Sequence, residues 1–481
     1  MTLALLLAWV LPWAAGVAVF CTLSAPRLPG WLPAALGHGL VIGLLLAALA
    51  CELFARADSA HALHHAGIPL GIFAVLAASV AWRRLRGAAG AAAESWRNVH
   101  KWKIALATLA LASLCWRGWI AAREIMLRPT FPWDAWDAWA VKSKVWFLLG
   151  HYAPFASLRD WLNLPSSEIY TGPAWSYPAA LSWMQVWFAS AVGSWIEPIV
   201  NMPWLVLWCG MLFGHYGQWR ALGLARLPAL AFVYFLGSLP LIVVHVALAG
   251  YADLWLACVF GFAVLAWLRW REQHDRGQLL LSMVCAIAMP WLKLEGAVWL
   301  LLFAGWTGYS SLPRRWRRYA LGALAAIALI GAAIGRLMLP LFGLGWVNIS
   351  LTSVTIPVIG TLAVGWHQGA LSGAAAALFA QPNWHLLWWL APVLVAWRWR
   401  ELMAHRALLS LAVLLLAGFS FLAFLFLFTD AARWAESYTA VNRLIMHLVP
   451  ATITLLALLC RDFPAIHRDT APTHAPSSGS A

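Results

Sequence analysis

The class of fold is decided by one apolar run, LLSLAVLLLAGFSFLAFLFLF, which occupies residues 408–428. The run has no charged side chain and, as a helix, is long enough to cross the roughly 30 Å hydrocarbon core of a bilayer. A transmembrane β-strand would alternate apolar and polar residues and would need neighbouring strands to satisfy its backbone groups. The continuous run therefore predicts a transmembrane α-helix.

Runs of this kind recur along nearly the whole chain. Of its 481 residues, 63% are hydrophobic, and the mean hydropathy is +0.76. A soluble domain could not bury that much apolar surface, so we expect an all-α polytopic integral membrane protein with about 13 transmembrane helices. The clearest candidate spans are residues 3–24, 31–54, 66–82, 103–122, 251–268, 296–310, 407–428 and 444–460.

The basic residues predict the orientation of these helices. The net charge is +14, but the arginines and lysines gather in short loops, as Arg83, Arg84 and Arg86 do after the third span. This is the positive-inside pattern of cytoplasmic loops, so we expect no nucleic-acid partner. By this topology residues 123–175 form the first long extracytoplasmic loop, and residues 341–383 also lie outside.

Three apolar segments resist a simple topology: residues 176–195, 199–216 and 227–245. They must carry the chain from outside back to outside, which an odd number of full crossings cannot do. We therefore expect one of them to enter the membrane without spanning it, and Arg220 with Arg226 indicates that the third starts inside.

The cysteines and the C-terminal residues carry no chemistry in this interpretation. Residues 464–481 end in a stretch rich in proline, serine and alanine and are expected to form a disordered cytoplasmic tail. The cysteines lie singly in or beside apolar segments and are expected to be small packing residues. They are Cys21, Cys51, Cys115, Cys209, Cys258, Cys285 and Cys460.

Polar residues concentrate in one stretch of the first outer loop, FPWDAWDAWAVKSKVWF at residues 131–147. Because proline favours a first helical turn, we expect an amphipathic helix to begin after Pro132, with Asp134 at its N-cap or first turn. The helix dipole favours an ionised Asp134, which is then equally a capping group or a general base. Trp136 and the other tryptophans are expected mainly as an interfacial aromatic belt.

Further polar groups are expected at the same face of the membrane. In this topology Asp253, Lys293, Glu295 and Arg443 all fall near extracytoplasmic helix ends, whereas the spans carry almost no ionisable residue at mid-depth. A coupled transporter would place such residues near the midplane. The distribution favours an enzyme that works at the outer interface.

These outer-face residues resemble a family. The acidic loop motif, with Asp134, Trp136, Lys142 and Lys144, is similar to that of bacterial polytopic glycosyltransferases of the GT-C superfamily, which also contains protein O-mannosyltransferases and lipid A aminoarabinose transferases. Four more segments are similar in the same order: Tyr177-Pro178, Gly250-Tyr251-Ala252-Asp253-Leu254, Lys293-Leu294-Glu295-Gly296, and Asn442-Arg443-Leu444 with His447 and Pro450. The resemblance implies a catalytic domain over residues 103–463, with residues 1–102 as accessory helices and a cytoplasmic loop.

The resemblance also implies an activity. A sugar would pass with inversion from a polyprenyl-phosphate carrier to an extracytoplasmic acceptor, either a cell-surface glycan or a lipid. Asp134 would be the base, supported by Asp137 and Asp253. Arg443 and Lys293 would bind the donor phosphate, arginine through its geometry and lysine as a point charge. The residues expected to assist are Glu295, Lys142, Lys144, Tyr177 and Trp136.

Two of these assignments have plainer alternatives, and one position departs from the family. Asp253 would serve equally as a helix N-cap, and Arg443 as a snorkelling cation at a helix end. Related proteins often have a histidine and an acid shortly before the Tyr-Pro pair, where this chain has Ala174-Trp175-Ser176. Either Glu168 or His151 takes over that task or this chain has lost it, so a divalent metal ion is the one cofactor that the pattern leaves open.

The resemblance implies a multi-pass protein among the lipids of a bacterial inner membrane, with its active site on the periplasmic face. Two other classes compete with it: a multi-helix transporter or lipid flippase of the cell envelope, and a non-catalytic assembly subunit. A cavity lined by Asp134, Asp253 and Arg443 together would favour the enzyme over both.

Overall fold

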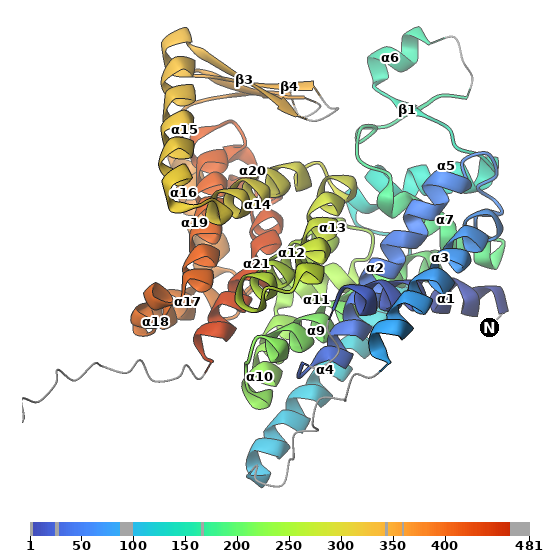
Figure 1. The fold of residues 1–481 in the computed structure, drawn as a ribbon. Helices are drawn as coiled ribbons and strands as arrows, with labels where there is room; N and C mark the ends of the chain where they lie inside the picture. Colours follow the sequence, from blue (N-terminus) through green and yellow to red (C-terminus); the bar gives the residue numbers. More distant parts are fainter. Residues whose placement is uncertain are drawn as a thin grey trace, which may run out of the picture.

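The computed structural model describes residues 3–24, 28–86, 100–164, 168–341, 345–357 and 360–461, and the expected tail at 464–481 lies outside them. The described chain is mostly helical (Figure 1). Seven of its helices are long and apolar enough to cross a membrane, which confirms the prediction of a helical membrane protein. They are α1 (Leu3–Leu23), α2 (Trp31–Phe54), α3 (Ala62–Leu85), α4 (Lys101–Leu127), α12 (Asp253–Gln273), α19 (Arg406–Phe428) and α21 (Val441–Leu459).

The expected number of about 13 crossings is wrong. Within the described residues the count rises only to eight, when α10 (Arg226–Ser238) and α11 (Pro240–Ala247), which are bent by 57°, are taken as one span. The segment at 176–195 forms only α7 (Ala180–Val192), and its 13 residues reach roughly 20 Å, short of the hydrocarbon core. Hydropathy alone does not separate a spanning helix from a short apolar helix buried in protein.

Shorter or less apolar helices connect these spans. The segment at 296–310 forms α14 (Gly296–Ser311), which is also shorter than a full span. The other connecting elements are α8 (Glu197–Asn201), α9 (Pro203–Ala221), α13 (Arg276–Leu292), α15 (Arg314–Ile334), α16 (Gln368–Ala375), the π-helix η2 (Ala376–Ala380), α17 (Leu387–Trp397), α18 (Trp399–Ala404) and α20 (Ala432–Glu436).

The mostly helical fold agrees with the prediction of an all-α membrane protein, and it also contains one antiparallel sheet of four strands between residues 336 and 363. Its strands pair in chain order, with Arg336 opposite Ser350 and Val354 opposite Leu362. Several strand residues, among them Val347 and Ile349, are β-branched and favour this geometry. The strands are β3 (Arg336–Leu341), β4 (Gly345–Ser350), β5 (Ser353–Ile356) and β6 (Gly360–Ala363).

The first outer loop forms a small substructure of its own. Its strands β1 and β2 pair in parallel, and α6 lies between them in the chain. Figure 1 shows α6 and the β3–β4 strands at the upper end of the molecule, and α18 and α10 at the lower end. The loop elements are the π-helix η1 (Ala135–Ala140), α5 (Val141–Leu149), β1 (Phe155–Ala156), α6 (Leu158–Asn163) and β2 (Tyr170–Thr171).

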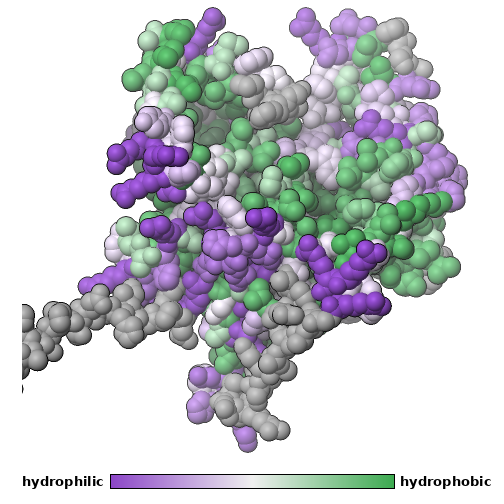
Figure 2. Space-filling model, viewed as in Figure 1, coloured by the Kyte–Doolittle hydropathy of each residue, from purple (hydrophilic) through white to green (hydrophobic). Residues whose placement is uncertain are grey.

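Helices α12 and α21 form the centre of the bundle. In each, 94% of the most apolar window is buried, compared with 11% in α4. Large apolar side chains of α3 and α4, such as Ile72 and Leu109, are exposed instead. Figure 2 shows hydrophobic residues over the area of α1–α3 and hydrophilic residues along the lower edge. The outer helices therefore present apolar surface to lipid, while α12 and α21 contact protein on all sides.

Glycines bring α2 into close contact with two neighbours. A Cβ added at Gly37 would lie 2.2 Å from the backbone nitrogen of Gly214 in α9, and one added at Gly16 of α1 would lie 2.1 Å from the carbonyl oxygen of Gly39 in α2. Small residues allow such backbone contact, which drives helix association where lipid removes the hydrophobic gain. The expected accessory helices therefore pack directly on α9, and their boundary as a separate unit stays a prediction.

Replacing one of these glycines tests the packing. Gly37→Ala should destabilise the protein by about 1–3 kcal/mol, because the added methyl group overpacks the contact between α2 and α9. Gly305→Ala is the matched control: Gly305 lies inside α14 with no atom near its Cβ position, so alanine should be neutral or stabilising there. Thermal unfolding in detergent measures both, and equal melting temperatures for the two variants would contradict the packing.

Candidate active site

The predicted site residues from three distant parts of the chain meet at one place. Nη2 of Arg443 in α21 lies 2.5 Å from Oδ2 of Asp134, which directly precedes η1. Nε of the same arginine lies 3.3 Å from Oδ2 of Asp253, the first residue of α12. Arg443 is therefore held between two carboxylates, which is more than a snorkelling cation at a helix end would require.

Asp253 is fully buried, so its charge depends on the groups around it. Its Oδ1 lies 2.8 Å from Nζ of Lys293 and 3.0 Å from Nε2 of His447. A carboxylate without partners in such a place would cost several kcal/mol (roughly), which these donors and Arg443 offset. Its side chain makes no helix-capping hydrogen bond. Asp253 is thus a structural anchor for the two cations, and it has no surface with which to touch a substrate.

His447 is held in one protonation state by its two neighbours. The indole nitrogen of Trp299 in α14 donates to Nδ1 of His447 at 2.9 Å. Because an indole N–H can only donate, Nδ1 carries no proton, and the proton on Nε2 is donated to Asp253. The histidine is therefore neutral, and its two hydrogen bonds connect Trp299 of α14 with Asp253 of α12.

Glu295 completes the cluster and makes its charge slightly negative. Its Oε1 lies 3.0 Å from Nζ of Lys293. Burial alone would lower the pKa of Lys293, but the carboxylates of Asp253 and Glu295 outweigh it and raise the pKa above its usual range. Three carboxylates, counting Asp134, therefore face the two cations Lys293 and Arg443.

A chain of side-chain contacts holds η1 in place. Oγ of Ser143 in α5 lies 2.7 Å from Oε1 of Gln185 in α7, and the amide nitrogen of Gln185 donates to Asn201 of α8 at 3.1 Å. Asn201 then donates to Oγ1 of Thr130 at 2.8 Å, just before the acidic stretch. The loop is thus fixed at both ends of η1 to helices of the bundle.

Asp134 is oriented by tertiary contacts and not by capping. Its side chain makes no cap hydrogen bond, and the turns that follow it form a π-helix, an element that is frequent at functional sites. Gly250, just before α12, allows close contact with Ala135 of η1. The φ of Gly250 is +116°, and an added Cβ would lie 2.4 Å from Cβ of Ala135. Of the two roles predicted for Asp134, capping is therefore wrong.

The other predicted loop residues have diverse surroundings. Trp136 is exposed and packs edge-on against Trp133, with ring centroids 5.1 Å apart. Asp137 is partly exposed, and burial together with the nearby Asp134 raises its pKa. Lys144 is exposed. Of the tryptophans in this stretch, Trp139 is fully buried and so belongs to the core.

Lys142 is a structural residue. It is buried, and its Nζ donates to the carbonyl oxygens of Trp175 at 2.9 Å and Tyr177 at 2.7 Å. It therefore ties α5 to the segment that enters α7. The charge of Glu295, together with burial, raises the pKa of Tyr177 above its usual range.

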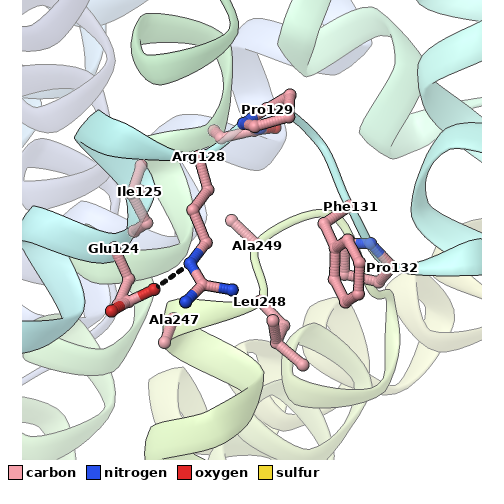
Figure 3. A pocket seen from close by; sticks show the side chains of 10 residues that line it. Glu124, Ile125, Arg128, Pro129, Phe131, Pro132, Ala247, Leu248 and Ala249 are labelled. Carbon is pink, nitrogen blue, oxygen red and sulfur yellow. Dashed lines mark ion pairs between the residues drawn. The ribbon is translucent and has the colours of Figure 1, made fainter.

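An open pocket adjoins Arg443. Its volume is about 490 Å³, and its wall includes Tyr251 and Arg443 together with Leu248. Asp134 and Asp253 pair with Arg443 but are not among the residues that line this pocket, so it is not the cavity lined by all three that would favour an enzyme. The guanidinium carbon of Arg443 lies 4.8 Å from the centroid of the Tyr251 ring. A second, far smaller pocket shares Leu248 with the open pocket, and there Arg128 pairs with Glu124 (Figure 3). That pocket has a volume of about 10 Å³, enough for a single water at most. Of these two pockets, the one beside Arg443 is therefore the one with room for a substrate.

The structure offers no built metal site in its described part. No group of three or more histidine, cysteine, aspartate or glutamate residues there is arranged to hold a metal ion. Glu168 and His151 are the expected substitutes for the missing family acid. In the outer loop, Nε2 of His151 lies 3.9 Å from Oε2 of Glu168. Neither has a described contact with Asp134, Asp253 or Arg443.

Several residues of this site were not predicted from sequence. His447 was part of the segment that resembles the family but had no role assigned to it; it follows Arg443 by one helical turn and so shares its face, a spacing that could have indicated that role. The pocket residues Gln381 and Asn383 come from the segment between η2 and α17 and carry no such signal. Comparison with models of known families, with curated proteins and with solved structures gives no match.

A double-mutant cycle tests the buried ion pair. Asp253→Asn and Lys293→Met should each destabilise the protein by about 3–5 kcal/mol, because each leaves a buried charge without its partner. The loss of stability in the double variant should be smaller than the sum of the two single losses by at least about 1 kcal/mol. Unfolding in mixed micelles measures all four proteins, and strictly additive losses would contradict the pairing.

The buried Lys142 predicts a pH dependence of stability. Burial lowers its pKa to about 8, so between pH 8 and its usual value the folded protein binds fewer protons than the unfolded chain. The free energy of unfolding should therefore rise with pH over that range, by on the order of 3 kcal/mol. Lys142→Met should lack this rise, and parallel pH profiles for the two proteins would exclude it.

Proposed function

We propose that this protein is a glycosyltransferase of a bacterial inner membrane. It moves a sugar from a polyprenyl-phosphate carrier to a glycan or lipid acceptor at the extracytoplasmic face. The observation that carries the proposal is the ion pair of Asp134 and Arg443 beside an open pocket. An enzyme of this kind needs a carboxylate for the acceptor and a guanidinium for the carrier phosphate within reach of one sugar.

The charges of the cluster favour replacement of one carboxylate partner of Arg443 by the donor phosphate when the donor binds. Arg443 already has two carboxylate partners, so a phosphate gains a place on it only by displacing one of them. Asp253 is fully buried in α12, whereas the side chain of Asp134 is 31% exposed. Asp134 is therefore the partner that gives way, and its release creates a free carboxylate beside the bound sugar.

The released carboxylate has a defined task in the transfer. Asp134 accepts the proton of the acceptor hydroxyl while the hydroxyl oxygen forms a bond to the anomeric carbon. The bond between that carbon and the phosphate oxygen breaks, and the carrier leaves as polyprenyl phosphate with both electrons of that bond. Because the acceptor attacks opposite the leaving phosphate, the configuration at the anomeric carbon inverts. Arg443 stabilises the charge on the leaving phosphate.

Two observations favour a transporter or lipid flippase as the second candidate. The 57° bend between α10 and α11 is a break of the kind that lines substrate sites in transporters. Polar groups also lie buried elsewhere in the bundle: His38 of α2 contacts Gln218 of α9, which accepts from Arg269 of α12. Movement of a labelled lipid across vesicles without any sugar transfer would favour this candidate.

Substitution of Asp134 separates catalysis from binding. Asp134→Asn should lower kcat at least about 100-fold, because the general base is lost. It should not weaken the binding of polyprenyl phosphate, since Arg443 has one competitor fewer. Carrier-phosphate release and lipid binding by the purified protein in nanodiscs measure the two effects. Full transfer by this variant would rule out the assigned role.

Substitution of Arg443 tests the other half of the site. Arg443→Ala should weaken donor binding about tenfold or more, because a charge-assisted contact to phosphate is lost, and it should affect acceptor binding much less. Asp160→Asn is the control, since Asp160 is an exposed aspartate of α6 in the same loop. A larger loss for the acceptor than for the donor would reassign Arg443.

A further inference from the structure

The pocket beside Arg443 has a wall that is polar but almost uncharged. Arg443 is its one fully charged residue, and the remaining polar lining comes from amide, hydroxyl and imidazole groups, including Gln381, Asn383, Asn442 and His245. No carboxylate lines the pocket. The carboxylates of Asp134 and Asp253, which pair with Arg443, are not among the lining residues. A cationic headgroup would therefore find no carboxylate on the pocket wall, and an anionic sugar would compete with its own phosphate for the same guanidinium.

A small amide network fixes the orientation of Asn442. Its Nδ2 donates to Oε1 of Gln381 at 2.7 Å, and Nδ2 of Asn383 donates to the same oxygen at 2.9 Å. The amide nitrogen of Asn442 is therefore turned toward Gln381, and its Oδ1 has no hydrogen-bond partner although the residue is only 7% exposed. Asn442 thus brings an unused acceptor to the pocket wall.

His245 brings a second unused acceptor. Its Nδ1 lies 2.9 Å from the carbonyl oxygen of Leu241, so Nδ1 carries the proton and donates it. In a neutral imidazole Nε2 is then an acceptor, and this atom has no partner although His245 is only 4% exposed. An unsatisfied buried acceptor costs free energy that a ligand donor recovers on binding. Both atoms are covered in the ligand-free pocket, so binding includes a small movement of its wall.

We propose that this pocket binds the sugar of the donor and selects a neutral, hydroxyl-rich hexose attached to a phosphate. The inference rests on the proposed function for the identity of the carrier. Arg443 takes the phosphate, and hydroxyl groups of the sugar donate to Asn442 Oδ1 and His245 Nε2. The apolar Leu241 and Leu248, which also line the pocket, belong to the bent α10–α11 pair and the segment after it, beside which the lipid chain enters.

Binding measurements on the full chain in nanodiscs test the pocket. The probes are a short-chain polyprenyl-phosphate hexose, its amino-sugar analogue, sugar-free polyprenyl phosphate and soluble hexose 1-phosphate. The neutral hexose lipid should bind at least about tenfold more tightly than the amino-sugar lipid. Equal or tighter binding of the amino sugar would overturn the class of substrate. Binding of soluble hexose 1-phosphate as tight as that of the lipid would keep the hexose pocket and overturn the lipid carrier.

Variants of the two acceptors locate the sugar. Asn442→Leu and His245→Phe should each weaken binding of the hexose lipid about tenfold, the loss expected for one neutral hydrogen bond, and leave sugar-free polyprenyl phosphate within about twofold. Asn442→Asp, which keeps the acceptor and adds a charge, should shift the preference toward the amino sugar. Thr452→Val is the matched control, because Thr452 is a buried polar residue of the same helix outside the pocket.

The outcomes separate this inference from the proposed function. If the hexose lipid binds with the expected pattern of variants but no carrier phosphate is released, the transfer is wrong and the pocket stands. If transfer occurs and the acceptor variants bind both lipids as the wild type does, the pocket assignment is wrong. Equal weakening of the hexose lipid and the sugar-free lipid would also overturn it, because the variants would then act through the phosphate site.

Discussion

The structure depends on one buried carboxylate. Asp253 begins the central helix α12 without any exposure to solvent, and an ionised group in such a place is tolerated only with donors around it. Lys293, from the turn between α13 and α14, and His447, from α21, donate hydrogen bonds to it. Arg443 of α21 adds a positive charge through an ion pair. Four helices are thereby joined at one point. Because burying the Asp253 carboxylate without partners would cost free energy, its ion pair with Arg443 couples the position of that arginine to the stability of the bundle.

This constraint leaves one partly exposed partner of Arg443 at the site. Arg443 pairs with Asp253, which is fully buried, and with Asp134, which comes from a loop and is partly exposed. The ion pair with Asp134 is therefore the one that a ligand could replace. The loop itself is positioned through the contacts of Ser143, Gln185, Asn201 and Thr130. A rigid cation with one replaceable carboxylate partner is an arrangement suited to exchange a phosphate for that carboxylate. The acceptors without hydrogen-bond partners, Asn442 Oδ1 and His245 Nε2, belong to residues that line the adjoining pocket.

Much of the cluster could be predicted from sequence for a simple reason. Ionisable residues are rare in apolar helices, and the basic loops indicate which helix ends share a side, so Asp134, Asp253, Lys293, Glu295 and Arg443 were expected at one face. Their pairing was not predictable, because it depends on which helices are neighbours. The sequence places Lys142 in a polar cluster. Only its hydrogen bonds to two carbonyl groups identify it as a buried residue that stabilises the loop.

The sequence by itself determined the helical membrane class, the chief spans and which ionisable residues lie near helix ends on one side, because hydropathy and charge are local properties on which membrane insertion directly depends. Only the tertiary structure decided which apolar segments stop short of a span, that residues 336–363 pair as a sheet, and that Asp253 is an anchor while Asp134 is the exposed carboxylate. These outcomes depend on burial and on contacts between distant segments. A side chain's burial is set by its neighbours in space, and no local pattern along the chain records them.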